Sequence, residues 1–407
     1  MHHFDTPSCP FLKINNSMKV FKSYLLWIIS CLLSVSGMAR QVDIIHGPYL
    51  QNLKETEVTI VWLSNKPTVG WVELIPNDNT HFYLCERPKF FDTTNGIKNV
   101  SDLHSVKING LKPGTSYRYR VFAREVLSFD GTDVVYGQTA STDVFSKEPL
   151  QFTTNSSQKK ELSFLIINDI HGRVSDIKCL LEAANYKEKE LFFFNGDMLS
   201  EVSNRDTIFS GFMDEAVKLF ASEKPMYYAR GNHETRGFFA RHFQDLFSVK
   251  EENLYFMFRQ GPICFIVLDT GEDKPDSDIE YCDITDYDTY RSEQARWLSE
   301  VVKSDMFKTA DYHIVIAHMP PLTDRTKRWH GQEEILRKFI PILNEVDIDL
   351  MLCGHLHKHI YQKPSSLIKF PIWVNSFDTV IEGTLHKGRL SIKMLDKKGN
   401  ILLNHNY

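Results

Sequence analysis

Apolar and polar positions follow two different patterns along this chain, and the change falls near residue 155. Residues 44–153 contain short segments in which apolar and polar residues alternate, as in VTIVWLS and SYRYRVFA, with turn residues between them. A two-residue period is typical of antiparallel strands with one buried face. We therefore predict an all-β sandwich over residues 41–155.

From residue 160 onward, continuous apolar runs alternate with helical patterns. Runs such as LSFLIIN, LFFFN and YHIVIA are apolar on both faces, as expected for strands covered on both sides. The tail after Lys369 returns to strands, which would complete a second sheet. The expected helices cover residues 174–186, 206–221, 237–247, 292–303 and 331–346. The pattern predicts an α/β sandwich over residues 160–407, after a polar linker.

The N-terminus has the pattern of an export signal. Two lysines precede an apolar run over residues 24–35, and small residues ending at Ala39 follow it. This run is too short to span a membrane comfortably, and the signal would start at Met18. We predict that residues 1–40 are a leader and signal peptide, and that the mature protein is secreted or periplasmic without a transmembrane anchor.

Composition and charge exclude some partners. The chain has 407 residues, is 42% hydrophobic and carries a net charge of −5, with no long block of one sign. It can therefore bury a sizeable core. It offers no electrostatic reason to expect a nucleic acid as partner. Oligomeric state stays open.

Five cysteines follow the predicted leader. Cys179, Cys264 and Cys353 lie in apolar stretches, where a buried free thiol is expected. Cys85 and Cys282 could form a disulfide. A CxxC spacing is absent from the sequence, which argues against a structural zinc site.

Five apolar runs end directly in residues that can bind a metal. They are LIINDIH with Asp169 and His171, FFFNGD with Asp197, YYARGNHE with Asn232, His233 and Glu234, HIVIAH with His318, and LMLCGHLH with His355 and His357. One such block is more often structural than functional. Because the carboxyl ends of strands in an α/β sheet share one edge, five blocks together predict a metal site there.

The donor types narrow the choice of metal. Two carboxylates, one amide and four imidazoles without a thiolate suit Mn, Fe, Zn or Co. Calcium alone would need more oxygen ligands. Gly196, Gly231 and Gly354 stand beside the donors, where a strand must turn sharply and the backbone must approach an ion closely.

In order, the blocks read DxH, GDxx, GNH with an acid, a later H, and GHxH, and this set resembles the calcineurin-like metallophosphoesterase family. The resemblance covers residues 163–407 and implies a four-layer sandwich with two divalent metal ions at the strand ends. It implies that the first ion is held by Asp169, His171, Asp197 and His357. It implies that the second is held by Asp197, Asn232, His318 and His355, so that Asp197 bridges the pair.

The resemblance also implies a reaction, the hydrolysis of small phosphate monoesters or diesters. Two cations about 3.5 to 4 Å apart acidify a bridging water and neutralise charge on the phosphoryl oxygens. His233 is expected to protonate the leaving oxygen or stabilise the transition state. Glu234 or Asp169 could at the same time fix it in its loop. Asp169 counts with His233 among the catalytic residues. Glu234 is expected behind the ligands, where it would orient a histidine.

One further segment could contact substrate. TDRTKRWHGQEE supplies Arg325, Arg328 and His330 between two of the ligand blocks, and these side chains could bind a phosphate or a leaving group. Charged runs of this kind are more often simply solvated.

The N-terminal region carries a resemblance of its own. In LKPGTSYRYRV, the residues Leu111, Pro113, Thr115 and Tyr117 have the spacing of the fibronectin type III corner, which implies that Tyr117 bonds to upstream backbone. This sandwich before a phosphoesterase domain resembles the purple acid phosphatases. That family has a tyrosine, a ferric-iron ligand, where this chain has Ser200, and lacks the histidine supplied by His171.

This departure from the purple acid phosphatases predicts a colourless enzyme that uses divalent metals. The alternative function is a cell-surface adhesion or binding protein in which the hydrolase fold is only a scaffold, although a binding role would not require all the proposed ligands.

Overall fold

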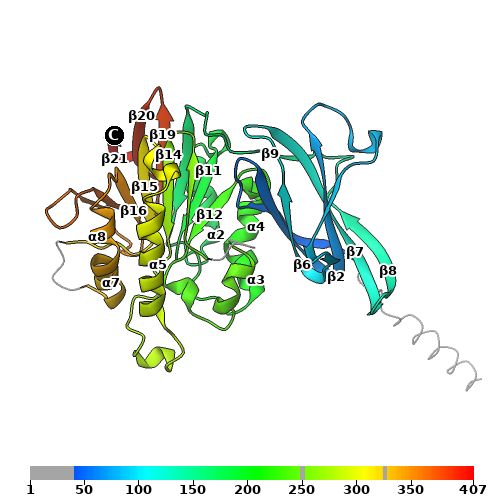
Figure 1. Ribbon diagram of the computed structural model, residues 1–407, viewed down its shortest axis with the longest axis horizontal. Helices are drawn as coiled ribbons and strands as arrows, with labels where there is room; N and C mark the ends of the chain where they lie inside the picture. Colours follow the sequence, from blue (N-terminus) through cyan, green and yellow to red (C-terminus); the bar gives the residue numbers. More distant parts are fainter. Residues whose placement is uncertain (1–40, 248–252, 324–327) are drawn as a thin grey trace, which may run out of the picture. The chain divides into compact units, whose positions relative to one another are not determined.

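The computed structural model describes residues 41–247, 253–323 and 328–407, and residues 42–407 form one compact unit (Figure 1). The predicted leader and signal peptide lie outside the described residues, as does Arg325. Within the described ranges, no helix is both long and apolar enough to cross a membrane.

The N-terminal region is all-β, as predicted. Its strands are β1 Ile44–Gln51, β2 Glu57–Pro76, β3 Lys89–Phe91, β4 Thr93–Thr94, β5 Ile97–Lys98, β6 Val100–Asn109, β7 Ser116–Asp130, β8 Asp133–Ser141 and β9 Leu150–Thr153. The first part of β2 pairs with β1 and β6, and its later part pairs with β3 and β7. Trp62 and Val72 of β2 and Tyr119 of β7 belong to one apolar core. The Lys112 backbone N–H donates to Tyr117 Oη at 3.0 Å, which confirms the corner bond implied by the resemblance.

Two six-stranded sheets follow. The first has the order β12-β11-β10-β19-β20-β21, with β10 Leu162–Ile167, β11 Leu191–Asn195, β12 Met226–Ala229, β19 Thr379–His386, β20 Arg389–Asp396 and β21 Ile401–Asn406. The second has the order β13-β14-β15-β16-β18-β17, with β13 Phe256–Gln260, β14 Ile263–Leu268, β15 Tyr312–Ala317, β16 Leu350–Cys353, β17 Ile360–Gln362 and β18 Ile372–Val374. Strands β10 to β12 are parallel, as are β14, β15, β16 and β18.

Helices cover the outer face of each sheet (Figure 1). They are α2 Val174–Ala183, α3 Arg205–Ile208 and α4 Asp214–Ala216 beside the first sheet, and α5 Tyr287–Val301, α6 Asp305–Lys308, α7 His330–Lys338 and α8 Ile340–Leu343 beside the second. One core cluster joins the two sheets to each other, and two more join each sheet to its helices. The predicted four-layer α/β sandwich is confirmed.

Some predicted helix bounds differ from the structure for local reasons. Helix α5 begins at Tyr287, before the predicted residue 292, because the Asp276 carboxylate accepts the backbone N–H groups of Tyr287 and Asp288 at 2.8 and 2.9 Å. The predicted helix 237–247 is wrong and reduces to a 3₁₀ helix, Ala240–Asp245. Gly237 has φ +97° there, in a backbone region that does not continue a helix.

Two further helical segments are interrupted. The predicted helix 206–221 is present, but the stretches Phe209–Met213 and Val217–Ala221 are π-helical. The predicted helix 331–346 is split into α7 and α8, and Pro341 stands at the start of α8, where its missing N–H is tolerated.

The disulfide left open between Cys85 and Cys282 is not formed. All five cysteines in the described part of the chain are free, and Cys85 and Cys282 are exposed. The Cys282 thiol contacts the Ile279 carbonyl of its own turn at 3.6 Å. Cys264 and Cys353 are buried as expected, but Cys179 is exposed because α2 buries the face that carries Ile177, Leu180 and Leu181.

Candidate metal centre

The expected metal-binding residues follow parallel strands at their carboxyl ends. Asp169 and His171 follow β10, Asp197 follows β11, Asn232 follows β12, His318 follows β15, and His355 and His357 follow β16. Backbone hydrogen bonds join neighbouring loops, from Asp169 N–H to the Gly196 carbonyl at 3.0 Å and from Gly354 N–H to the His318 carbonyl at 2.9 Å. Both sheets therefore contribute to one set of loops.

The backbone at these positions is unusual. Five of the seven expected ligands have left-handed backbone angles, namely Asp169 (φ 56°), His171 (48°), Asp197 (54°), His355 (73°) and His357 (51°). Such angles are uncommon for residues other than glycine and cost about 1–3 kcal/mol each. They persist where the surrounding structure over-determines them, which is frequent at functional sites.

Two glycines make room for the donors. A Cβ on Gly196 would lie 2.4 Å from His318 Nδ1, and a Cβ on Gly231 would lie 2.3 Å from Asp197 Oδ1. Neither position can carry a larger residue without displacing a donor. The sequence-based expectation of close backbone approach holds at both.

The two carboxylates are held in the same way. Asp197 Oδ1 accepts the His233 backbone N–H at 3.0 Å, and Asp169 Oδ2 accepts the His355 backbone N–H at 2.9 Å. Both residues are buried. The remaining oxygens face imidazoles, with Asp197 Oδ2 3.0 Å from His318 Nε2 and Asp169 Oδ1 3.2 Å from His357 Nε2.

His318 supplies the sharpest test of whether a cation fits here. Its Nδ1–H donates to the Asn195 carbonyl at 2.7 Å, so the neutral ring directs the lone pair of Nε2 toward Asp197. His318 Nε2 and Asp169 Oδ1 are buried without a hydrogen-bond partner among the described residues. His318 Nε2 and Asp197 Oδ2 lie 3.0 Å apart in this buried site, and two acceptors so placed require positive charge between them. In the protein alone a proton supplies it: burial lowers the pKa of His318, but Asp197 outweighs this and raises it to about 10.

Two of the other imidazoles, those of His171 and His355, are ready to bind a cation. Burial lowers the pKa of His171 and of His355 to about 4, so both rings are neutral near pH 7 and carry a free lone pair. His171 Nε2 lies 3.2 Å from His357 Nε2, and His355 Nδ1 lies 3.0 Å from Asn232 Oδ1. Burial also opposes the charge on Asp197, but His318 and the other imidazoles lower its pKa below the ordinary value.

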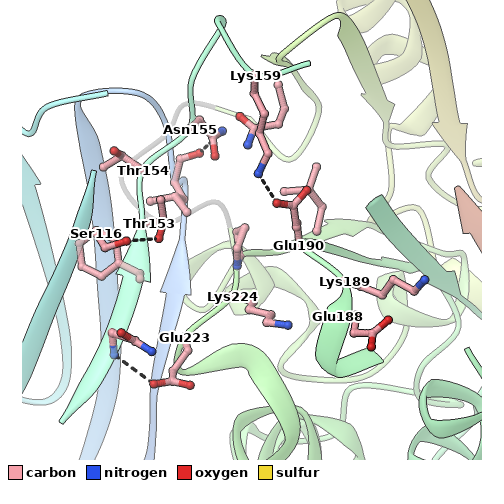
Figure 2. Close-up of a pocket in the computed structure, with 16 residues that line it drawn as sticks. Ser116, Thr153, Thr154, Asn155, Lys159, Glu188, Lys189, Glu190, Glu223 and Lys224 are labelled. Atoms are coloured by element: carbon pink, nitrogen blue, oxygen red, sulfur yellow. Dashed lines mark hydrogen bonds and ion pairs between the residues drawn. The ribbon is translucent and has the colours of Figure 1, made fainter. Parts of the chain in front are cut away.

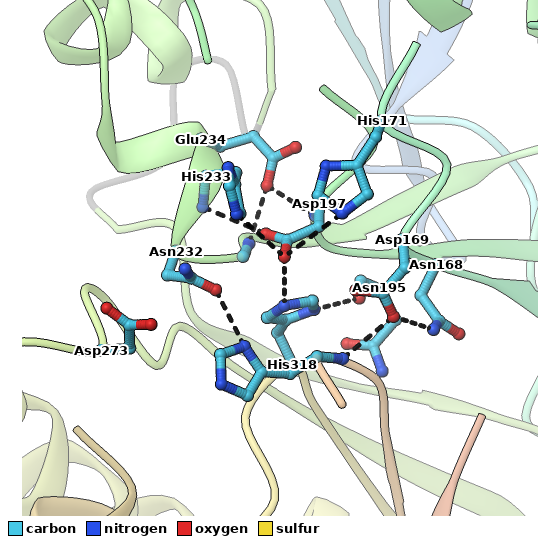
Figure 3. Close-up of polar contacts among 12 residues, drawn as sticks. Asn168, Asp169, His171, Asn195, Asp197, Asn232, His233, Glu234, Asp273 and His318 are labelled. Atoms are coloured by element: carbon cyan, nitrogen blue, oxygen red, sulfur yellow. Dashed lines mark hydrogen bonds and ion pairs between the residues drawn. The ribbon is translucent and has the colours of Figure 1, made fainter. Parts of the chain in front are cut away.

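The donor atoms form overlapping groups, each spanning less than 4.8 Å: Asp169, His171 and His357; His171, Asp197 and His233; and Asp197, His318 and His355. Figure 3 shows Asp197 between His171, His233 and His318. Because Asp197 belongs to two groups, one carboxylate faces both halves of the site. This arrangement and its unpaired buried atoms fit two divalent cations better than one.

His233 is oriented by a backbone group. Its Nδ1–H donates to the Ser200 carbonyl at 2.7 Å, which leaves Nε2 4.0 Å from Asp197 Oδ2. Ser200, at the position where the purple acid phosphatases have a tyrosine, also has its hydroxyl 3.4 Å from His171 Nδ1. Its carbonyl therefore orients the His233 ring, which receives no hydrogen bond from Glu234 or Asp169 among the described residues.

Glu234 lies behind the donors, but its partners differ from the expected ones. Its buried carboxylate accepts backbone N–H groups of Asp197 at 2.8 Å, Gly231 at 3.0 Å and Leu199 at 3.2 Å. None of these hydrogen bonds is to a histidine ring, and the expectation that Glu234 orients a histidine stays a prediction. Glu234 fixes the backbone of the loop that carries Asp197.

Arg328 and His330, which are predicted to contact substrate, bind other groups of the protein. Arg328 donates to the carbonyls of Leu322 and Thr323 at 2.6 and 3.0 Å. His330 Nε2 lies 2.9 Å from the Asp288 carboxylate. Their role in substrate binding stays a prediction.

Sequence reasoning missed two asparagines that support the site. Asn168 donates to the Asp169 carboxylate and, at 3.2 Å, to the Asn375 carbonyl. Asn195 donates to the carbonyls of Ala317 and Leu352 in the other sheet at 3.4 and 3.3 Å. Both end otherwise apolar runs, LIIN and LFFFN, and a buried polar residue at a strand end was the available signal.

A separate polar pocket of about 350 Å³ lies at the opposite edge, beside Leu191 at the start of β11 (Figure 2). Several of its charged groups have protein partners: Lys159 pairs with Glu190, Glu223 accepts the Gln151 backbone N–H at 3.2 Å, and Lys224 donates to backbone carbonyls. It lacks the convergence of unpaired donors found around Asp197.

Comparisons with known proteins agree with this geometry. Residues 162–359 match the family model of the calcineurin-like phosphoesterases. Purple acid phosphatase 21 of Arabidopsis thaliana is 22% identical over 282 residues, 65% of this chain and 54% of that protein, so the chain spans about half the length of this curated relative. The structure of purple acid phosphatase PPD1 from yellow lupin (Lupinus luteus) seeds matches 88% of this chain and 73% of its own, with a TM-score of 0.60 at 15% identity, which shows a shared fold. Residues 162–359, which carry all the expected metal-binding residues, are therefore similar to the calcineurin-like phosphoesterases.

Proposed function

We propose that this protein is a hydrolase of phosphate esters that depends on two divalent metal ions. The observation that carries the proposal is the convergence of metal-capable donor atoms in overlapping groups, with Asp197 in two of them and five of the seven expected ligands in left-handed backbone conformations. The family match and the relatives support the same reaction class.

The proposed ligands are the seven named from the sequence. Asp169, His171, Asp197 and His357 would hold one ion, and Asp197, Asn232, His318 and His355 would hold the other. When bound, such ions stabilise charge on phosphoryl oxygens and supply a nucleophilic water at neutral pH. Mn, Fe, Zn or Co suits the donors, and the lack of a phenolate at Ser200 favours a colourless protein.

His233 is proposed to act on the leaving oxygen. With Nδ1–H donated to the Ser200 carbonyl, Nε2 is the atom that faces the site, and a proton carried there can be passed to a departing alkoxide. Asp169 is proposed to act in catalysis as a ligand. Glu234 maintains the backbone that presents Asp197.

The test combines metal analysis with a phosphoester panel. We expect about two divalent ions per chain, hydrolysis of p-nitrophenyl phosphate or of its bis-ester, loss of activity with a chelator, and recovery with one of the four metals. The comparison of the two esters decides between monoesterase and diesterase. A protein that is replete with metal but inactive on the panel would overturn the proposal and favour a binding role.

A strong visible charge-transfer band in the purified protein would contradict the divalent assignment. The secreted or periplasmic location, proposed from residues 1–40, is tested separately by fractionating cells and sequencing the mature N-terminus.

A further inference from the structure

The residues Asn232 and His233 lie on a very short element. The 3₁₀ helix η5, His233–Thr235, is a single turn. A turn of this length has poor internal hydrogen bonds and does not hold its own position. Its position must come from side chains on either side.

On one side, the Glu234 carboxylate holds the turn by accepting the backbone N–H groups of Gly231, Asp197 and Leu199. The other side is held by Glu272, which lies in the loop after β14 and is fully buried. Glu272 accepts Arg236 Nε–H at 2.9 Å and Arg236 Nη2–H at 2.7 Å, and its carboxylate lies 2.9 Å from Thr235 Oγ1. The guanidinium contact is bidentate, which fixes direction as well as distance.

Thr235 connects this contact to a proposed ligand. Its single hydroxyl proton is shared between two acceptors, the Asn232 carbonyl at 2.7 Å and the Glu272 carboxylate at 2.9 Å. Glu272 thus contacts Thr235 directly and is linked to Asn232 through the Thr235 hydroxyl.

The loop that carries Glu272 is itself immobilised. Arg291 donates to the Glu272 carbonyl, and the Gly331 N–H donates to the Asp273 carbonyl at 2.9 Å. Asp273, drawn beside Asn232 in Figure 3, accepts a second contact from Arg236 at 3.2 Å. Burial opposes the charge on Glu272, but Arg236 more than offsets it and lowers the pKa to about 2, so the carboxylate is charged near pH 7.

We propose that Glu272 is a positioning residue of the site, which acts through Thr235 and Arg236 to hold the η5 turn so that His233 faces Asp197. This inference rests on the proposed function. It predicts that Glu272 affects catalysis through His233, although Glu272 has no contact with a proposed ligand side chain among the described residues.

The test is Glu272→Gln, which keeps the side-chain size but removes the charge and one acceptor oxygen. We expect kcat on p-nitrophenyl phosphate to fall about 10- to 100-fold, by analogy with other residues that orient a site from behind it. KM and metal content should stay within a factor of about three, since the proposed ligands are untouched. The matched control is Glu73→Gln, because Glu73 is another buried carboxylate paired with an arginine, Arg120, at 2.6 Å in the sandwich. This control should leave kcat unchanged.

Two further measurements separate positioning from a general loss of structure. In the metal-free protein, amide hydrogen exchange in residues 231–236 should be at least about tenfold faster in Glu272→Gln, with no change in the sandwich. In a His233→Ala background, Glu272→Gln should cost less than about twofold in kcat, because the group that it positions is gone.

The outcomes distinguish the two proposals. An equal loss of kcat with and without His233, or unchanged kcat and exchange in an active protein, would overturn the positioning role alone. A wild-type protein that is inactive on phosphoesters would refute the proposed function. Faster exchange in residues 231–236 of Glu272→Gln would still show that Glu272 holds the η5 turn.

Discussion

Two regions of the molecule each bury a histidine beside an aspartate. In the sandwich, His104 Nδ1 lies 3.4 Å from Asp92 Oδ2, and in the phosphoesterase domain, His318 Nε2 lies 3.0 Å from Asp197 Oδ2. Both imidazoles are fully buried. By residue type and exposure the two pairs are nearly the same.

Their surroundings differ. The second nitrogen of His104 lies 2.6 Å from Thr68 Oγ1, and Asp92 also accepts Asn99 Nδ2–H at 3.0 Å. The sandwich pair is therefore a local polar network that joins Thr68 of β2 and His104 of β6 to Asp92 and Asn99, which lie between strands. Around Asp197, by contrast, His171, His233 and His355 also converge, and five of the expected ligands have a left-handed backbone. Convergence and backbone strain, more than the pair itself, mark the functional region.

The largest expected effect comes from removing the shared carboxylate. Asp197→Asn keeps the shape but removes the charge that faces both halves of the site, so we expect kcat/KM to fall about 10³-fold or more, with loss of bound metal. Metal analysis and phosphoester kinetics measure both. Asp92→Asn is the matched variant in the sandwich, where we expect a loss of about 1–3 kcal/mol in unfolding free energy and nearly normal kcat. Similar kinetics for the two variants would erase the distinction.

His233→Ala should separate chemistry from metal binding. We expect kcat to fall about 10²- to 10⁴-fold, the range for a lost acid–base group, while metal content stays near that of the wild type. The reason is that Nε2 of His233 is 4.0 Å from Asp197 Oδ2, and its ring is held by the Ser200 carbonyl rather than by a proposed ligand. If metal and turnover fall together, His233 is structural, like His104.

Much of this site could be predicted because its donors are adjacent to strong strand patterns. Asp169, Asp197 and His318 each follow an apolar run, and the parallel order of strands brings such ends together. The supporting contacts could not be predicted in the same way. Glu272 reaches the η5 turn from a loop after a different strand, and periodicity says nothing about which distant side chains a loop will meet.

The same limit explains the wrong predictions. A helical pattern suggested a helix over residues 237–247, but the left-handed angle at Gly237 depends on how that loop packs. Likewise, the pairing of Cys85 with Cys282 followed from counting thiols, which carries no information about distance.

Tyr117→Phe tests the sandwich alone. It removes the hydroxyl that accepts the Lys112 N–H at 3.0 Å and leaves the ring in place, so we expect a loss of about 0.5–1.5 kcal/mol in unfolding free energy. Urea titration measures the loss. The kcat should be unchanged, and a large fall in kcat would mean that the corner influences the phosphoesterase domain.

The smallest effect is expected from removing an ion pair that joins the N-terminal sandwich to the region beyond residue 160. Asp102 in β6 pairs with Arg205 in α3 at 2.6 Å, but their side chains are 41% and 28% exposed. Solvent screening limits such a pair to about 0.2–1 kcal/mol. The junction has stronger contacts, since Tyr49 Oη donates to the Leu246 carbonyl at 3.0 Å from within an apolar cluster that contains residues of both regions.

The pH dependence of Asp102→Asn follows from the sign of its shift. The Arg205 contact lowers the pKa of Asp102 below 3.8, so the pair stabilises the fold above that value and loses its contribution as the pH falls through the lower folded pKa. We therefore expect a small loss of stability in the variant near pH 7, measured by urea titration, and none well below pH 3.8. The loss should also shrink near 1 M salt, where the screening length is about 3 Å. A loss that persists in acid or in high salt would show that Asp102 acts through packing, and the junction would then depend on Asp102 as well as on the buried Tyr49.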